Sequence, residues 1–150
     1  MPISEICNRE TIIVRSDDTA LEAARLMRQH HVGDVLVVEY SNEGARIPLG
    51  IVTDRDLVVE IMASGLDPET ITAGDIMAPG LVMVKQNTGV FEAIQYMRAN
   101  GVRRLPVVDD TNALIGIITL DDLLELLSEE LLALAKLVKH EQKKEIMKRR

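Results

Sequence analysis

Short apolar runs alternate along this chain with stretches in which the apolar residues have a helical period. The runs 11–14 and 81–84 are short and rich in β-branched residues, which predicts two strands. After each run the apolar residues recur at i, i+3, i+4 and i+7, the spacing of a helix with one buried face. These positions are Ala20, Ala23, Ala24 and Met27 in the first stretch and Val90, Ala93, Ile94 and Met97 in the second. Thr19 with Glu22 predicts the cap of the first helix.

Each helical stretch is followed by two more apolar runs that are joined by a polar turn. The pairs are 35–38 with 49–52 and 105–108 with 114–118, and their connections hold Asn, Gly or Asp, which favours hairpins. Pro106 predicts an edge strand or a strand entry, because proline cannot donate to a sheet ladder. A helix is expected from Arg55 to Ser64, with Gly65 as its stop, and another from Asp121 onward.

These elements form an internal repeat. A shift of 70 residues aligns Met27-Arg28 with Met97-Arg98, and after a slip in the loop 41–48 the segment Gly50-Ile-Val-Thr-Asp-Arg-Asp-Leu aligns with Gly116-Ile-Ile-Thr-Leu-Asp-Asp-Leu. Units of roughly 60 residues bury little surface alone, so we expect the two sheets to pack together. The sequence predicts an α+β fold with a first copy at 1–70, a second copy at 71–128 and a helical extension at 129–150.

The last helix continues much further than its counterpart in the first copy. Its apolar face is broader than one small repeat needs to cover, and it ends in a basic stretch, 140–150. The apolar positions are Leu123, Leu124, Leu126, Leu127, Leu131, Leu134, Leu137 and Val138. We expect this helix to pack on another subunit, in a homodimer.

Composition argues against several classes of function. Aromatic residues are 2% of the chain and the net charge is -7, so base stacking and attraction to a phosphate backbone are both weak, and no nucleic-acid partner is expected. The single cysteine, Cys7, permits no intrachain disulfide and no thiolate cluster. The first residues do not resemble a signal peptide and no apolar run could span a bilayer. We expect a cytoplasmic protein.

Catalytic and metal-binding patterns are not apparent in the sequence. It has no Walker or Rossmann glycine loop and no nucleophile paired with a base. His30 and His31 are adjacent, so on a helix end they point in different directions and cannot share a metal. The acidic pairs 17–18 and 109–110 fall in turns, where Asp is common for its backbone bonding. We therefore expect no enzyme, no catalytic residue, no metal site and no obligatory cofactor.

The repeats resemble a tandem cystathionine-β-synthase (CBS) domain protein, or Bateman module. The resemblance covers residues 2–128 and rests on the helices that end in Met-Arg, the LPVVD strand at 105–109 and the two segments that begin at Gly50 and Gly116. It implies β-α-β-β-α units with pseudo-two-fold symmetry. It also implies clefts between the units that bind an adenosyl ligand such as AMP, ADP, ATP or S-adenosylmethionine.

The resemblance also implies site residues. In the family, the Thr and Asp of the repeated segment contact phosphate or ribose, which here are Thr53 and Asp56 for one site and Thr119 and Asp122 for the other. Phosphate contact is implied for Arg103 and Arg104. Adenine is expected against apolar strand residues, for which the candidates are Ile12, Ile13, Val14, Val82, Met83 and Val84. The first copy has Gly33-Asp34 where the second has the arginines, so we expect unequal sites, with a charged nucleotide held chiefly by the second copy.

Each of these residues also has a structural interpretation. Thr and Asp at the start of a helix satisfy free amides and complement the helix dipole without any ligand, and the arginines could form a solvated rim. The function expected is a regulatory, adenine-nucleotide-binding module that senses ligand level and transmits it through a dimer interface, with the long helix as output. The alternatives are a ligand-free structural or partner-binding CBS protein and an S-adenosylmethionine binder.

Overall fold

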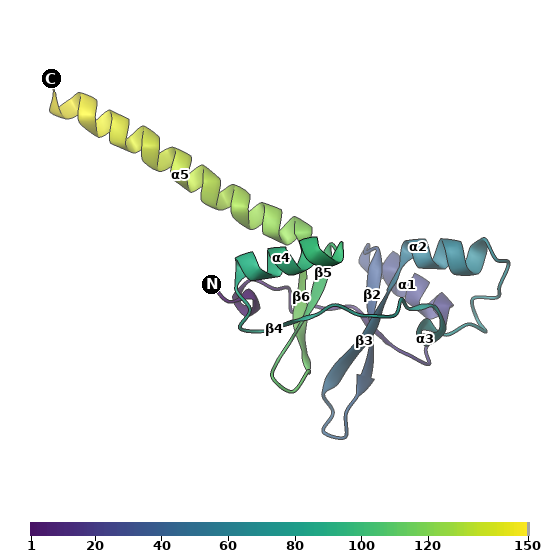
Figure 1. The fold of residues 1–150 in the computed structure, drawn as a ribbon. Coiled ribbons are helices and arrows are strands. Elements are labelled where there is room, and N and C mark those ends of the chain that lie inside the picture. The colour runs from purple at the N-terminus through teal and green to yellow at the C-terminus, as the bar shows by residue number, and fades with distance from the viewer. Residues whose placement is uncertain (150) are drawn as a thin grey trace. The chain divides into compact units, whose positions relative to one another are not determined.

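The computed structural model describes residues 1–149, and the chain divides into two units, Met1–Ile118 and Thr119–Arg150. The first unit contains two three-stranded sheets with the strand orders β1-β2-β3 and β4-β5-β6 (Figure 1). The second consists almost entirely of the 29-residue helix α5 (Leu120–Lys148). The predicted α+β class and the order strand, helix, strand, strand, helix are confirmed in both copies.

The first copy contains two strand pairs of opposite sense. β1 (Ile13–Arg15) lies parallel to β2 (Asp34–Tyr40), and β2 is antiparallel to β3 (Arg46–Thr53). The parallel pair is connected by α1 (Ala20–His30) and the antiparallel pair by a short polar turn. After β3 the chain forms one α-helical turn, α2 (Asp54–Asp56), and then continues as a π-helix, η2 (Leu57–Met62), in the region where the sequence predicts a helix from Arg55 to Ser64.

The second copy repeats this order with β4 (Val84–Lys85), α4 (Val90–Asn100), β5 (Arg104–Val108) and β6 (Leu114–Thr119). The helices α1 and α4 bury the same three positions of the predicted face. These are Ala20, Ala23 and Met27 in α1 and Val90, Ala93 and Met97 in α4. Both helices end on a left-handed residue, His31 and Gly101, which satisfies a carbonyl of the last turn.

The prediction that Pro106 marks an edge or strand entry is wrong, because β5 is the middle strand of its sheet and Pro106 is buried. The first copy shows how the sheet accommodates it. There, Leu36 N donates to Ile12 O at 3.0 Å. Pro106 occupies the position of Leu36 and has no N–H. Parallel pairing in the second sheet therefore begins only at Val84 with Val107, and β4 is one residue shorter than β1.

The leading segment of each copy is hydrogen-bonded to the other copy. The N-terminal turn η1 (Ile3–Glu5) donates from Ile3 N to Thr88 O at 2.7 Å, and Asn8 exchanges two backbone bonds of 2.9 Å with Ile117. In Figure 1 this purple turn lies beside β4 and α4. Reciprocally, α3 (Ala73–Ile76) donates from Ala73 N to Asp18 O at 2.8 Å. The boundaries of the two copies that the sequence predicts, 1–70 and 71–128, stay a prediction.

These crossing segments explain the glycine of the repeated motif. A Cβ atom on Gly50 would lie 2.7 Å from Met77 Sδ, and one on Gly116 would lie 2.5 Å from Asn8 O and 2.9 Å from Cys7 Sγ. Cys7 and Met77 are equivalent positions of the two copies. The motif therefore needs glycine for the close approach of a neighbouring segment, and no ligand is required to explain it.

The two sheets pack on each other within the first unit, as the sequence predicts. Successive residues of β2 alternate between two hydrophobic clusters. Val35 and Val37 join the cluster that includes residues of α1 and Ala73. Leu36 and Val38 pack in a second cluster with Leu114 of the other copy. The strand is thus buried on both faces, which fits its continuous apolar run.

The helix α5 begins at a cap on Thr119 and exposes most of its apolar residues. Leu123 is buried, whereas Leu131 is 68% exposed and Leu134 is 60% exposed. Through residue 149 the protein contains no helix that combines the length and the apolar character needed to cross a membrane.

Candidate functional site

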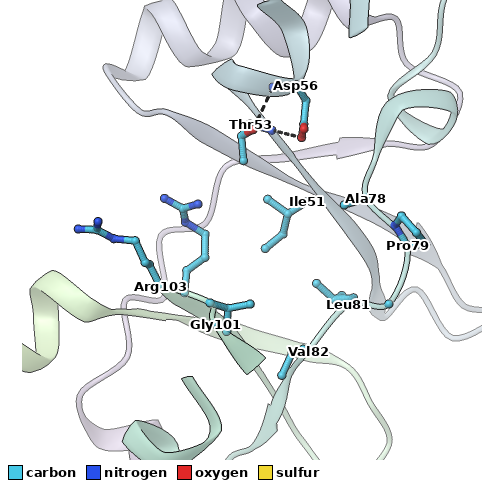
Figure 2. Close-up of a pocket in the computed structure, with 12 residues that line it drawn as sticks. Ile51, Thr53, Asp56, Ala78, Pro79, Leu81, Val82, Gly101 and Arg103 are labelled. Atoms are coloured by element: carbon cyan, nitrogen blue, oxygen red, sulfur yellow. Dashed lines mark hydrogen bonds between the residues drawn. The ribbon is translucent and has the colours of Figure 1, made fainter. Parts of the chain in front are cut away.

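A pocket of about 410 Å³ lies within the first unit (Figure 2). Three segments line it: the end of β3 with the start of α2, the stretch between α3 and β4, and the turn from α4 into β5. Their lining residues are Ile51, Thr53 and Asp56, then Ala78, Pro79, Gly80, Leu81 and Val82, then Gly101, Val102, Arg103 and Arg104. The pocket is therefore formed by both copies and its size is in the range of small-molecule sites.

Thr53 and Asp56 form a reciprocal helix cap at one side of the pocket. Thr53 Oγ1 accepts from Asp56 N at 3.1 Å, and Asp56 Oδ2 accepts from Thr53 N at 2.9 Å. Figure 2 shows both bonds. The cap bond to the carboxylate ends on Oδ2, which leaves Oδ1 as an acceptor for a ligand hydroxyl. The structural interpretation of this pair is thus correct, and it is compatible with binding.

The same cap occurs twice more in the chain. Thr72 with Asp75 has bonds of 3.1 and 3.2 Å, and Thr119 with Asp122 has bonds of 3.0 and 3.1 Å. Thr72 and Asp75 do not line the pocket. The Thr-x-x-Asp pattern is therefore a capping device wherever it occurs here. What distinguishes Thr53 and Asp56 is the apolar cavity with two arginines beside them.

Arg103 and Arg104 line the pocket from the α4–β5 turn, and Arg103 lies across the cavity from Thr53 (Figure 2). Arg103 is exposed and Arg104 is partly buried. Arg104 Nε lies 3.0 Å from Asp34 Oδ2 in an ion pair. The Nε–H bond is not aligned with that carboxylate, so within residues 1–149 this buried nitrogen has no hydrogen-bond partner.

Asp34 is the first-copy residue at the position of Arg104, and it neutralises a cation of the pocket. Burial raises the pKa of the Asp34 carboxyl above its ordinary value; the Arg104 guanidinium opposes this increase and the nearby Asp54 adds to it. Asp54 lies close to Asp34, because the backbone N of Asp54 donates to the carbonyl of Gly33 at 2.9 Å. The sequence predicted that this acid weakens phosphate binding at its own copy's site. The structure locates its ion pair on the arginine of this pocket.

An apolar patch separates the carboxylate and the arginines. Ile51, Leu81 and Val82 point toward the cavity in Figure 2. The carbonyl of Val82 is equivalent to that of Ile12, which accepts from Leu36 N. Because Pro106 stands in place of Leu36 and has no N–H, the Val82 carbonyl lacks this sheet donor. Val82, which lines the pocket, thus has a backbone acceptor that is outside the hydrogen-bond ladder of the sheet.

The structure brings together only some of the residues that the sequence singled out. Thr53, Asp56, Arg103, Arg104 and Val82 share the pocket. The other apolar candidates do not line it: Ile12, Ile13, Val14, Met83 and Val84. Val14 and Val84 are core residues, each 3% exposed. Thr119 and Asp122 belong to the second unit.

Sequence reasoning missed Ile51, Leu81 and the turn 78–80, which supply much of the wall. The Pro79-Gly80 pair before an apolar run was the one available signal, since it marks a turn beside a strand. Among residues 1–149 no group of three or more His, Cys, Asp or Glu side chains is arranged to hold a metal ion.

In sequence, the chain matches a family model and individual proteins. The family model of the CBS domain matches twice, at residues 3–63 and 73–129. An uncharacterized protein of Methanopyrus kandleri is 39% identical over 123 residues, 82% of this chain and 61% of that protein. Hypoxic response protein 1 of Mycobacterium tuberculosis is 34% identical over 125 residues, 83% of this chain and 84% of that protein. This chain thus spans less than two thirds of the Methanopyrus relative.

Solved structures agree with the sequence matches. The crystal structure of hypoxic response protein I, which has two coordinated zinc ions, superposes with a TM-score of 0.72 at 31% identity and covers 83% of this chain and 98% of that one. A CBS domain protein of Pyrobaculum aerophilum complexed with AMP has a TM-score of 0.69 at 24% identity, over 81% and 89% of the two chains. With two family matches in register with the two structural copies, this chain belongs to the CBS domain family as a tandem CBS protein.

Proposed function

We propose that this protein is a regulatory module that binds an adenine nucleotide, AMP, ADP or ATP, in the pocket between its two CBS copies. One observation carries the proposal: two arginines and a capped carboxylate face each other across an apolar cavity of about 410 Å³. A nucleotide has a partner for each of these groups: an anionic phosphate for the arginines, a ribose diol for the carboxylate and an apolar base for the cavity wall.

Each part of the nucleotide has a matching group. Arg103 and Arg104 supply guanidinium donors for phosphate oxygens. Asp56 Oδ1 accepts from a ribose hydroxyl, while Oδ2 stays in the helix cap. The base lies against Ile51 and Leu81, and the Val82 carbonyl accepts from the exocyclic amine of adenine.

S-adenosylmethionine fits this pocket less well than a nucleotide. Its sulfonium is a cation, which two neighbouring guanidinium groups repel. The Pyrobaculum protein complexed with AMP shares only the fold with this chain, and it illustrates that this fold accommodates AMP. That the protein is not an enzyme and needs no obligatory cofactor stays a prediction.

Binding could regulate a partner through the position of the pocket. Its groups come from both copies, so a nucleotide bridges them, and it can shift an equilibrium only if it binds one arrangement better than another. A homodimer whose subunit contacts differ between these arrangements would transmit the signal. The regulated protein and the cytoplasmic location stay predictions.

Isothermal titration calorimetry with AMP, ADP, ATP and S-adenosylmethionine tests the proposal. We expect heat with at least one nucleotide and a higher midpoint of thermal unfolding, since a ligand at about 100 times its Kd stabilises a protein by about 2.7 kcal/mol. Absence of heat and of thermal stabilisation with all four would rule the proposal out. Nucleotide retained by protein purified without added ligand, identified by mass spectrometry, would show the natural occupant.

A ligand-free structural role is the second candidate, favoured by the cap at Thr72 and Asp75, which has the same geometry outside the pocket. The two roles are separated by comparing Asp56→Ala with Asp75→Ala. Each variant loses the carboxylate bond of one capping box, so each should be less stable than the wild-type protein. Only a ligand-binding role predicts that Asp56→Ala also abolishes nucleotide binding while Asp75→Ala retains it.

A further inference from the structure

The exposed face of α5 has the spacing of a coiled-coil seam. Five apolar residues follow one another at intervals of three and four: Leu124, Leu127, Leu131, Leu134 and Val138. Their exposed fractions are 53%, 38%, 68%, 60% and 54%. An average interval of 3.5 residues keeps a stripe facing a second helix along its whole length. α5 therefore presents a continuous apolar seam over almost four turns.

This seam is unusual for the surface of a monomer, because contiguous apolar patches on soluble proteins mark interaction sites. Leu132, which lies next to Leu131 but off the seam, is also exposed. The 3–4 spacing, and not exposure alone, therefore defines the face. Beyond Val138 the seam positions are Glu141 and Glu145, so the apolar part ends there.

The charges of α5 are divided between its two halves. Residues 120–135 contain five acids and no Lys or Arg, whereas residues 136–149 contain six Lys or Arg and two Glu. A parallel pair of such helices would place acid against acid and base against base. An antiparallel pair places the acidic half of each helix beside the basic half of the other, which favours association and sets orientation.

The apolar seam and the charges select the same antiparallel register. If Leu131 of one helix lies opposite Leu134 of the other, Leu127 lies opposite Val138, and both layers occur twice by symmetry. The acidic stretch 121–130 then faces residues 135–144, which contain four lysines and one glutamate. Leu124 meets Glu141 at each end of the seam. Moving one helix by a heptad, so that Leu127 faces Leu131, brings Glu129 opposite Glu129 of the other copy.

From the spacing, the exposure and the charge division together, we propose that α5 pairs with α5 of a second copy of this chain as an antiparallel two-stranded coiled coil. This pairing supplies the subunit contact of the homodimer in the proposed function, and it does not depend on nucleotide binding. The homodimer is isologous, because the same seam contributes to both sides.

Cross-linking tests the pairing and its direction. In a Cys7→Ser background, single variants Leu124→Cys and Glu141→Cys are expressed separately and together, and treated with a short bis-maleimide. We expect a cross-linked dimer only from the co-expressed pair, joined between residues 124 and 141. Dimers from Leu124→Cys alone would show a parallel pair and overturn the proposal, as would no dimer in any sample.

A matched pair of substitutions tests the seam itself. Leu131→Glu in both cysteine variants should abolish the cross-link, and Leu132→Glu, an identical change one residue away and off the seam, should preserve it. Circular dichroism of both variants checks that the fold is intact. Equal loss with both variants, or retention with both, would contradict the assignment of the seam. Calorimetry with nucleotide on Leu131→Glu keeps this test separate from that of the pocket.

Discussion

Replacing Asp34 by asparagine should tighten nucleotide binding at a pocket that Asp34 does not line. The change keeps the size of the side chain and removes the charge that lies 3.0 Å from Arg104 Nε. In the wild-type protein a phosphate must compete with this carboxylate for the guanidinium. In the variant Arg104 is free to bind phosphate.

The geometry of the ion pair sets the size of the effect. The Arg104 and Asp34 side chains are 33% and 22% exposed, so solvent screens the pair, and about 1 kcal/mol is a reasonable upper value for its strength. Losing the negative charge adds about 0.5 kcal/mol for each phosphate charge at about 8 Å in water. The second contribution alone comes to about 1 kcal/mol for the two phosphate charges of AMP, so the Kd should fall by about fivefold or more. The gain should increase from AMP to ADP to ATP.

Acidity should reproduce part of this change in the wild-type protein. Burial raises the pKa of Asp34, so its carboxyl is neutralised above the pH at which an ordinary Asp is protonated. As the pH falls through that raised pKa, Asp34 loses its charge and releases Arg104. Nucleotide binding by the wild-type protein should therefore strengthen relative to binding by Asp34→Asn. The ligand phosphate titrates identically with both proteins and cancels in the comparison. For stability the sign is the same: charging the partly buried Asp34 lowers the free energy of unfolding as the pH rises between the ordinary and the raised pKa.

Calorimetry on three proteins makes this comparison: wild type, Asp34→Asn and Asp54→Asn. The last is the control, since it removes a neighbouring exposed carboxylate and keeps the ion pair to Arg104. The reasoning predicts the larger gain for Asp34→Asn. Unchanged or weaker binding by Asp34→Asn would refute it, and would mean that Asp34 orients Arg104 for the ligand.

Three further predictions concern the caps, the glycines and the proline. Asp56→Ala and Asp75→Ala should each lower the free energy of unfolding in urea, the former by about 1 kcal/mol, and only the former should lose nucleotide binding in calorimetry. Gly116→Ala should cost about 1 to 3 kcal/mol, because its Cβ meets Asn8 O at 2.5 Å, and Gly89→Ala, with no atom within 4 Å, should cost far less; equal urea midpoints would contradict the crossing-segment explanation. Pro106→Ala supplies an N–H for the Val82 carbonyl, so it should extend β4 and weaken adenine binding, whereas unchanged affinity would exclude that carbonyl as the acceptor of the base amine.

The elements of this protein could be predicted because their signals are local. The buried positions of α1 and α4 follow from a helical period, and the duplicated segment at Gly50 and Gly116 reveals the two copies. The prediction for Pro106 was wrong because it assumed that every residue of a middle strand is hydrogen-bonded to both neighbouring strands. Here the short β4 leaves that position without a required donor.

The composition of the pocket was harder to predict, because it depends on which segments of different copies meet. The sequence assigned the Thr, Asp and Arg candidates to binding sites only through the family resemblance. In the fold, Thr53 and Asp56 of the first copy share a cavity with Arg103 and Arg104 of the second. The apparent equality of the two repeated segments conceals this, since spacing within a copy contains no information about contacts between copies.

The exchange of leading segments makes neither copy self-sufficient. Residues 3–8 are hydrogen-bonded to Thr88 and to Ile117 of β6, and residues 71–74 are hydrogen-bonded to residues 16–20 at the start of α1. If the second copy were expressed alone, Gly116 of β6 would lose the segment that packs against it. Contacts such as Ile3 with Thr88 join distant parts of the chain, and pairing of this kind slows folding. The two copies are therefore connected like a covalently linked, domain-swapped dimer, and truncation of the first nine residues should destabilise the second copy.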